Sequence, residues 1–229
     1  MQLNAKRYAP ITALLLCLSA TASHASTLWY NGDFDGGDAF SNELNSSVSD
    51  GRVYDNFQVT GAGWTIDSLW SNDLMSFTTT SADWEIRSGV STGNGGTLVA
   101  SGTSSATQTA TGRSALGFTE YQILVSGLNI SSGPGTYWPA VTPIGTGTGR
   151  SGNTTTSNAN GVGTLLDGGA FINSTFFSNN FASFDDPTVD FSMGIDGTEV
   201  APVPEPASLT LLGLGLAGMG ARRWRQRKA

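Results

Sequence analysis

Residues 63–70 read GWTIDSLW, and this stretch decides the fold class. Trp64, Ile66 and Trp70 recur at even spacing, so they are expected to share one face with Ser68. The residues between them are mostly polar and are expected to point the other way. This period of two is typical of a β-strand that has one face in the core.

The same alternation appears on both sides of this stretch. Residues 83–89 (DWEIRSG) and 120–128 (EYQILVSGL) repeat it, and seven Asn-Gly or Asp-Gly dipeptides mark turns along the chain. No segment has the period of an amphipathic helix. We therefore predict an all-β fold, with a single β-sandwich or jelly-roll domain. Residues 143–163 are so polar and glycine-rich that we expect a long loop there.

Charge is distributed unevenly along the 229 residues. From Asp33 to Glu199 there are 17 acidic residues against four arginines, a net charge of −13, whereas the whole chain has −7. Such a surface repels nucleic acid and anionic lipid, and it suits cations or uncharged partners such as neutral sugars. We therefore expect no nucleic-acid partner.

Reactive side chains are scarce. The single cysteine, Cys17, and the single histidine, His24, precede residue 26, and the two lysines lie near the two ends of the chain. Residues 26–202 thus lack the bases and ligands of Ser-His-Asp or Cys-His catalysis, of Cys/His zinc sites and of lysine nucleophiles. We expect a protein that is not an enzyme, and carboxylate chemistry is the catalytic alternative left open.

The first 26 residues have the three parts of a secretory signal peptide. Lys6 and Arg7 supply the charge, residues 11–20 form the apolar stretch, and a small-x-small site ends at Ala25. We predict cleavage between Ala25 and Ser26.

The last 27 residues combine three features. A Pro-Glu-Pro sequence comes first, an apolar run over 207–221 follows, and basic residues end the segment. The apolar run is expected to form a short helix of roughly 22 Å, against about 30 Å for a hydrocarbon core, so it spans a membrane only marginally. The residues concerned are Val203, Pro204, Glu205 and Pro206 in the motif, and Arg222, Arg223, Arg225, Arg227 and Lys228 in the basic tail.

This C-terminal segment resembles the PEP-CTERM sorting signal, which some naming schemes call an ice-binding-protein C-terminal domain. The resemblance implies an exported protein of a Gram-negative bacterium, held transiently in the inner membrane by the tail. It also implies processing by an exosortase-type protease and a final place at the cell surface or outside the cell. Such proteins usually accompany exopolysaccharide and biofilm matrix, so polysaccharide and the export machinery are the expected partners.

The middle of the chain also resembles known proteins. Segments such as YDNFQVTGAGWTIDSLWSN (54–72) and ADWEIRSGVSTGNGGTLVASGT (82–103) are similar to the β-sandwich body of many secreted PEP-CTERM proteins. We predict three parts: a signal peptide over 1–25, a β-sandwich domain over 26–202 and a sorting signal over 203–229.

One short motif suggests a metal. Asn31, Asp33 and Asp35 alternate before Gly36, like the first half of a calcium-binding loop, and Asp38 adds another oxygen. The distal acid of such a loop would be expected one residue before the actual Glu43, so an acidic turn without metal is the alternative. A structural calcium ion is the only cofactor that we consider.

Other candidate sites have simpler explanations. Asp83 and Glu85 share a strand face, and we expect this face to be solvated and balanced by Arg87. Trp29, Trp64, Trp70, Trp84 and Tyr137 are expected to pack in the core and not to stack on sugars, whereas both roles stay open for Trp138, which lies beside a turn. Threonine runs at 77–80, 145–149 and 153–156 are reminiscent of ice-binding faces but follow no fixed repeat.

Three functions remain as hypotheses. The one we favour is a non-catalytic cell-surface or matrix protein, sorted by an exosortase-type system and associated with exopolysaccharide. The alternatives are a carboxylate-dependent glycan-active enzyme, which requires two carboxyl groups about 5–10 Å apart in a cleft, and an ice- or surface-binding protein, which requires a flat threonine-rich face.

Overall fold

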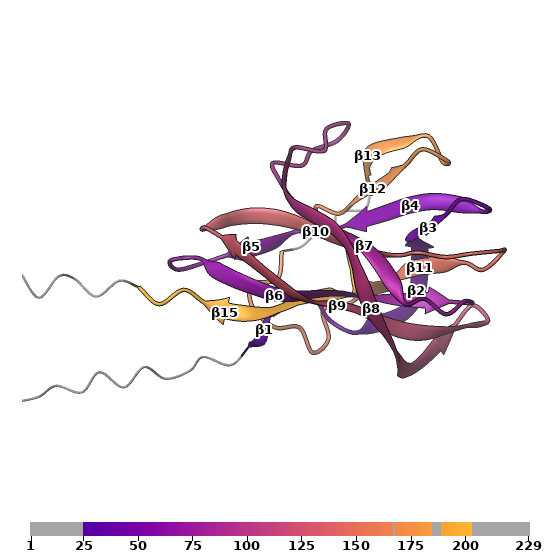
Figure 1. The fold of residues 1–229 in the computed structure, drawn as a ribbon, viewed down its shortest axis with the longest axis horizontal. Helices are drawn as coiled ribbons and strands as arrows, with labels where there is room; N and C mark the ends of the chain where they lie inside the picture. Colours follow the sequence, from indigo (N-terminus) through magenta and orange to yellow (C-terminus); the bar gives the residue numbers. More distant parts are fainter. Residues whose placement is uncertain (1–24, 167, 185–188, 203–229) are drawn as a thin grey trace, which may run out of the picture.

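The computed structural model describes residues 25–166, 168–184 and 189–202. Every regular element in these ranges is a β-strand, which confirms the predicted all-β class (Figure 1). The predicted signal peptide before Ala25 and the whole predicted sorting signal over 203–229, with its helix, lie outside the described residues. No helix within the described ranges is long and apolar enough to cross a membrane. The division of the chain at residues 25/26 and 202/203 stays a prediction.

The strands follow the turn signals along the chain. They are β1 (Ser26–Tyr30), β2 (Phe34–Ser41), β3 (Glu43–Asn45), β4 (Ser49–Tyr54), β5 (Phe57–Val59), β6 (Trp64–Met75), β7 (Ser81–Ser88), β8 (Thr97–Ala115), β9 (Phe118–Ser132), β10 (Gly135–Pro143), β11 (Ser151–Thr156), β12 (Phe171–Ser174), β13 (Asn179–Ser183), β14 (Asp190–Phe191) and β15 (Met193–Glu199).

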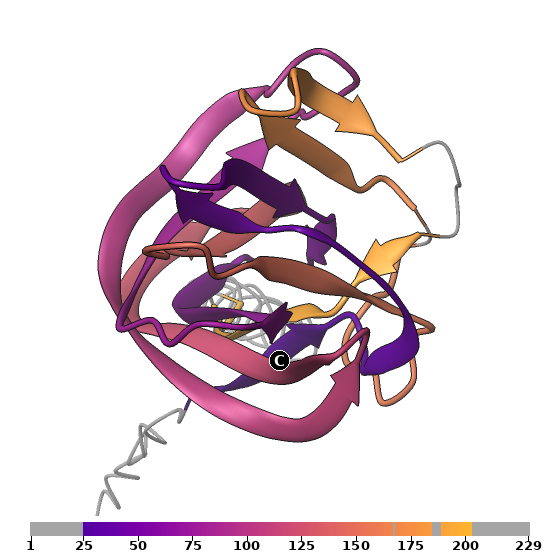
Figure 2. The ribbon, with the colours of Figure 1, turned by 90° about the vertical axis from the view of Figure 1, so that its right-hand side faces the viewer.

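Two sheets build the domain. The larger has 11 strands with the path β1-β15-β6-β9-β8-β7-β10-β5, and β11 joins β6 to β2 and β14 beside this path. The smaller sheet has the order β13-β12-β4-β3. Seen end-on, the strands curl around one interior (Figure 2). The 19-residue strand β8 makes this curl possible, because its first half pairs with β7 and its second half with β9.

The core lies inside the curled sheet. It contains four of the five bulkiest fully buried apolar side chains, among them Trp29 and Phe57, whose ring centroids are 5.7 Å apart. The small sheet adds a second apolar cluster, in which Tyr54 of β4, Phe171 of β12 and Phe181 of β13 meet Ala140 of β10. The small sheet therefore covers part of the outer side of the large one.

Strand β6 changes face part-way along, which corrects one expectation. Its pairing with both β15 and β9 shifts at Asp67, so this residue forms a bulge. Trp64 and Ile66 point into the core as predicted, but Leu69 continues the core face after the bulge and Trp70 does not. Trp70 instead lies on the opposite face, over Gly194, where a Cβ atom would come within 2.2 Å of its ring.

The predicted loop over 143–163 contains a strand. Residues 151–156 form β11, which pairs with β2, β6 and β14, and most of its polar side chains are buried. The Asn153 amide donates to the carbonyl oxygens of Asn72 and Ser192 at 2.8 and 3.1 Å, and the Thr154 hydroxyl donates to Asn72 at 3.0 Å. The prediction failed because these hydrogen bonds, and not apolar side chains, hold the strand in the interior.

Candidate functional site

Asn31, Asp33 and Asp35 of the predicted calcium loop contact different protein partners. Asn31 is fully buried, and its amide nitrogen donates to Asp55 at 2.9 Å. Asp35 accepts hydrogen bonds from Thr155 at 2.8 Å and from the backbone of Gly37. The described residues contain no group of three or more His, Cys, Asp or Glu side chains arranged for a metal ion.

Asp33 is committed to protein partners. Its carboxylate accepts from the Tyr30 hydroxyl at 2.6 Å and from the Asn160 amide at 2.7 Å, and it pairs with Arg113 at 2.9 Å. Partial burial acts to raise its pKa, but these hydrogen bonds and the Arg113 charge lower the pKa of Asp33 below its ordinary value. It is therefore an anion whose oxygens are already engaged. Calcium binding by the 31–38 loop, with Asp38 as a further ligand, stays a prediction.

The face with Asp83 and Glu85 is not solvated as expected. Arg52 of the small sheet reaches across to form ion pairs with both carboxylates, and Arg87 pairs with Glu85. The Tyr54 hydroxyl also donates to Glu85 at 3.1 Å. These acids therefore join the two sheets. The sequence pattern around Asp83 and Glu85 could not predict the ion pairs with Arg52, because Arg52 is distant in sequence.

Most of the candidate sugar-stacking aromatics are in the interior. Trp29, Trp64, Trp70 and Trp84 are buried, as the alternation favoured. Tyr137 stacks on Phe57 at 5.7 Å, and Trp138 packs edge-on against Phe171 and donates its N–H to Gly169. The threonine run at 153–156 lies largely inside the domain, because Thr154, Thr155 and Thr156 are buried.

Two aromatics that the sequence did not single out are exposed. Phe176 and Phe177 follow β12, with 62% and 44% of their surface accessible, and their rings meet edge to face at 5.0 Å. Their exposure depends on where the small sheet ends.

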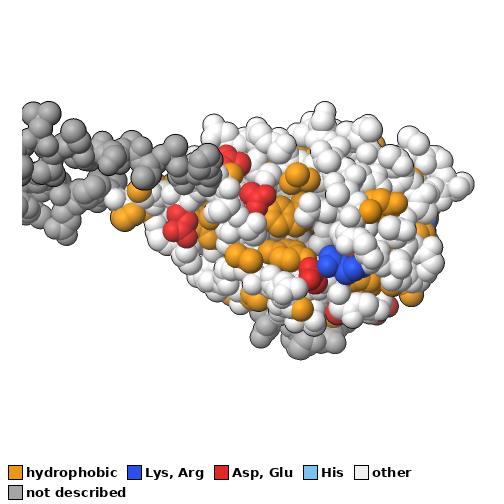
Figure 3. Space-filling model, turned by 90° about the horizontal axis from the view of Figure 1, so that it is seen from below, with side chains coloured by type: hydrophobic (Ala, Val, Ile, Leu, Met, Phe, Trp, Pro, Cys, Tyr) orange, Lys and Arg blue, Asp and Glu red, His pale blue; other side chains and the backbone are white. Residues whose placement is uncertain are grey.

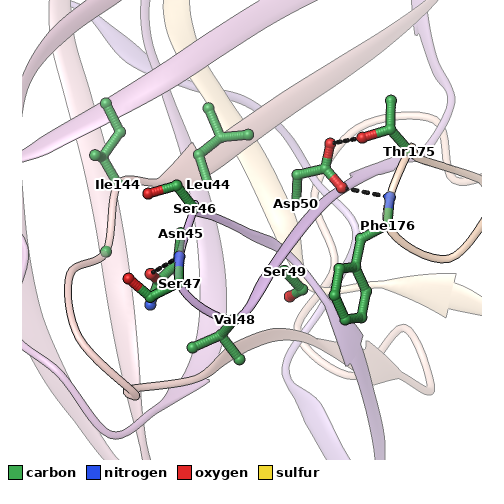
Figure 4. A pocket seen from close by; sticks show the side chains of 11 residues that line it. Leu44, Asn45, Ser46, Ser47, Val48, Ser49, Asp50, Ile144, Thr175 and Phe176 are labelled. Atoms are coloured by element: carbon green, nitrogen blue, oxygen red, sulfur yellow. Dashed lines mark hydrogen bonds between the residues drawn. The ribbon is translucent and has the colours of Figure 1, made fainter.

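Phe176 borders a groove of about 630 Å³. Residues 44–50 of the β3–β4 hairpin line it together with Ile144, Gly145, Thr175 and Phe176. Ile144 lies beside Leu44, whereas Thr175 and Phe176 lie beside Asp50 (Figure 4). Leu44, Val48 and Ile144 supply apolar surface. Ser46 and Ser47 supply exposed hydroxyls and Asp50 a carboxylate, whereas Asn45 and Ser49 are buried and bonded within the protein.

Asp50 is that carboxylate, and it is tightly held. It accepts hydrogen bonds from the Thr175 hydroxyl and from the backbone N–H of Phe176 at 2.7 Å, which also orients the loop that carries the ring (Figure 4). Partial burial acts to raise its pKa, but these hydrogen bonds lower the pKa of Asp50 below its ordinary value. An ionised acceptor suits binding, whereas a general acid requires a raised pKa.

The face of the molecule drawn in Figure 3 carries few charges. This view, from below relative to Figure 1, shows apolar side chains in a broken strip, with scattered acidic groups and a small basic area (Figure 3). All four arginines between residues 25 and 202 pair with carboxylates. A surface of this kind offers little to a polyanion such as nucleic acid.

Buried acids are a further feature that sequence reasoning missed. Glu43, Asp55, Asp73, Glu120 and Asp190 are all at most 2% exposed. Glu43 and Glu120 pair with Arg150 and Arg113. Buried acids cannot be recognised from the local pattern, because their partners come from distant strands.

Comparison with known proteins identifies one segment. Residues 202–227 match the family model of the PEP-CTERM protein-sorting motif. The chain carries a PEP-CTERM sorting motif. It therefore has the signal of an exported protein that is anchored transiently in the membrane and processed by an exosortase-type system.

The matched range includes the predicted motif residues and the four arginines of the basic tail. From Val203 onward these residues lie outside the described part of the structure, as does Lys228. Ala25 and Ser26, the predicted cleavage site, are exposed at the start of β1. No curated protein and no solved structure matched the chain.

Proposed function

We propose that the PEP-CTERM protein is a non-catalytic surface or matrix component whose β-domain binds a neutral polysaccharide in the groove beside the β3–β4 hairpin. The observation that carries this proposal is the composition of the groove. An exposed Phe176 ring shares the groove with the exposed hydroxyls of Ser46 and Ser47 and with one carboxylate, Asp50, held by hydrogen bonds. Aromatic rings stack on sugar faces, while hydroxyls, amides and carboxylates bond to sugar hydroxyls.

The groove composition supports binding without catalysis. Glycoside hydrolysis requires two carboxyl groups flanking the scissile bond, one of which must hold a proton. The described groove residues include one carboxylate, Asp50, and its pKa is lowered. The absence of Cys, His and Lys from residues 26–202 removes the other common catalytic groups.

The sorting motif supports the location. A protein that reaches the surface through an exosortase-type system meets the polysaccharide that its own cell secretes. We place the mature protein at the surface of a Gram-negative cell or in its matrix, with exopolysaccharide as partner.

The groove proposal predicts a specific loss of binding. Replacing Phe176 by Ala is expected to weaken binding of the full chain to the host's extracellular polysaccharide at least about tenfold, because covering a Phe side chain contributes roughly 1.5–3 kcal/mol. Affinity is measured by co-sedimentation or calorimetry. Leu116→Ala, at the exposed tip of the β8–β9 hairpin, is the matched control and should bind like the wild type.

Different outcomes identify different functions. Equal affinity of the Phe176→Ala and wild-type proteins would contradict the groove as binding site. Release of soluble sugar from the polysaccharide would favour the enzyme alternative. Thermal hysteresis of the protein solution without polysaccharide binding would favour the ice-binding alternative.

The sorting assignment makes its own prediction. Replacing Pro204, Glu205 and Pro206 together by Ala is expected to leave the chain unprocessed in the inner membrane, since the protease then lacks its recognition sequence. Cell fractionation and gel mobility in the native host measure this. Val200→Ala, two residues before the matched range, should be processed normally. Normal release of the triple variant would show that another segment directs sorting.

A further inference from the structure

The chain leaves the β-domain at a fixed point, just before the sorting motif. Strand β15 ends at Glu199, which pairs with Trp64 at the start of β6. The backbone N–H of the next residue, Val200, donates to the carbonyl oxygen of Gly63 at 2.8 Å. The match to the sorting motif begins at residue 202. Backbone hydrogen bonds therefore hold the chain to within two residues of the motif.

The β5–β6 turn forms the surface around this point. Thr60, Gly61 and Ala62 are exposed in this turn. Gly63, which ends it, has a φ of 118°, and a Cβ atom there would lie 2.6 Å from a carbonyl oxygen of β9, so the turn is fixed by a residue that only glycine can replace. The turn and Glu199 line a hollow of about 340 Å³. We call the exposed residues Thr60, Gly61, Ala62 and Glu199 the exit surface.

The exit surface lies at one end of the domain. Ser26 of β1 pairs with Gly197 of β15, so the first strand starts beside the end of the last one (Figure 1). Strand β6 runs from this end to the other, because its first residue pairs with Glu199 and its last, Met75, pairs with Thr119 of the β8–β9 hairpin. The 12 residues of β6 span about 36 Å. The β8–β9 hairpin is therefore at the far end.

The tether between domain and motif is short compared with a protease. From Val200 to Pro204, the first proline of the Pro-Glu-Pro sequence, the chain takes four residue steps, which span at most about 14 Å. A domain of about 100 residues already has a radius of gyration of about 13 Å, and its outer radius is larger. An active-site cleft also holds residues on both sides of the bond that is cut, so less of the tether stays free.

We propose that the exit surface contacts the exosortase-type protease during processing. Its side chains are small and uncharged except for Glu199, so another protein can approach the backbone of the turn closely. The protease then meets the motif together with a folded surface, and not as an isolated linear sequence. The proposal rests on the sorting motif and is independent of polysaccharide binding in the groove.

Processing of the full chain in its native host tests the proposal. Ala62→Glu places a larger, charged side chain on the exit surface and is expected to slow processing at least about tenfold, because burying an unpaired charge in a contact is costly. Pulse-chase labelling and gel mobility measure the conversion of precursor to processed form. Leu116→Glu adds the same charge at the exposed tip of the β8–β9 hairpin and should be processed like the wild type. Processing of Ala62→Glu at the wild-type rate would overturn the proposal.

A longer tether separates loss of contact from loss of folding. A linker of about twelve Gly and Ser residues between Ala201 and Pro202 leaves the matched range intact and adds roughly 20 Å of reach. With this linker, Ala62→Glu is expected to be processed as fast as the linker chain without the substitution. Equally slow processing with the linker would show that the substitution acts through folding or export, and would overturn the contact. Polysaccharide binding by Ala62→Glu is expected to be unchanged, so failure of this proposal is distinguishable from failure of the groove.

Discussion

Replacing Asp73 by Asn is expected to raise the free energy of unfolding at pH 8 by about 4 kcal/mol, and to change it little near pH 4. Asp73 lies on β6 and is fully buried. Burial raises the pKa of Asp73 to about 7, and nearby Glu120 acts in the same direction. Hydrogen bonds from Ser71, Asn42 and Ser151 act in the opposite direction without cancelling the effect.

The direction of the pH effect follows from proton binding. Between its ordinary pKa of 3.8 and about 7, Asp73 holds a proton in the folded protein and has lost it in the unfolded chain. Stability therefore falls as pH rises through this interval, by about 1.4 kcal/mol for each unit of pKa difference. Asparagine stays neutral at every pH and removes this loss.

Urea denaturation from pH 4 to pH 8 measures the effect. The quantity compared is the difference between wild type and Asp73→Asn at each pH, since other acids titrate in both proteins. Asp67→Asn, a partly exposed carboxylate of the same strand, is the matched control and should follow the wild-type curve. A difference that stays constant from pH 4 to pH 8 would show that Asp73 does not titrate in this interval.

Asn153→Ala is expected to destabilise the domain by about 2–4 kcal/mol. The substitution removes two buried hydrogen bonds to backbone carbonyls and leaves a void in β11. Thermal or urea unfolding measures the change. Thr148→Ala is the matched control, because Thr148 is exposed in the same glycine-rich stretch, and a change within about 0.5 kcal/mol is expected. Equal stability of the two variants would mean that β11 is not part of the core.

The two stability predictions concern buried polar side chains, Asp73 and Asn153, whose burial the alternation of apolar and polar residues could not predict. Alternation identified β6, β7 and β9 correctly, since apolar residues at every second position report the core face directly. It failed for β11, whose buried positions are Asn and Thr, because pattern analysis counts such residues as exposed. It also misplaced Trp70, because the bulge at Asp67 shifts the period by one residue.

The groove also could not be predicted from the sequence pattern. Residues 45–50 of the groove and Phe176 lie more than a hundred positions apart, and they meet only because β12 pairs with β4. No spacing within one segment encodes this arrangement.

The sequence by itself determined the all-β class and the sorting address. Both are local properties: a period of two within each strand, and a linear motif whose match to residues 202–227 needs no structure. Only the tertiary structure decided which polar side chains are buried, where the aromatic groove lies and which acids face one another. The physical reason is that a buried polar group is stable only with partners, and here those partners come from strands far apart in the chain.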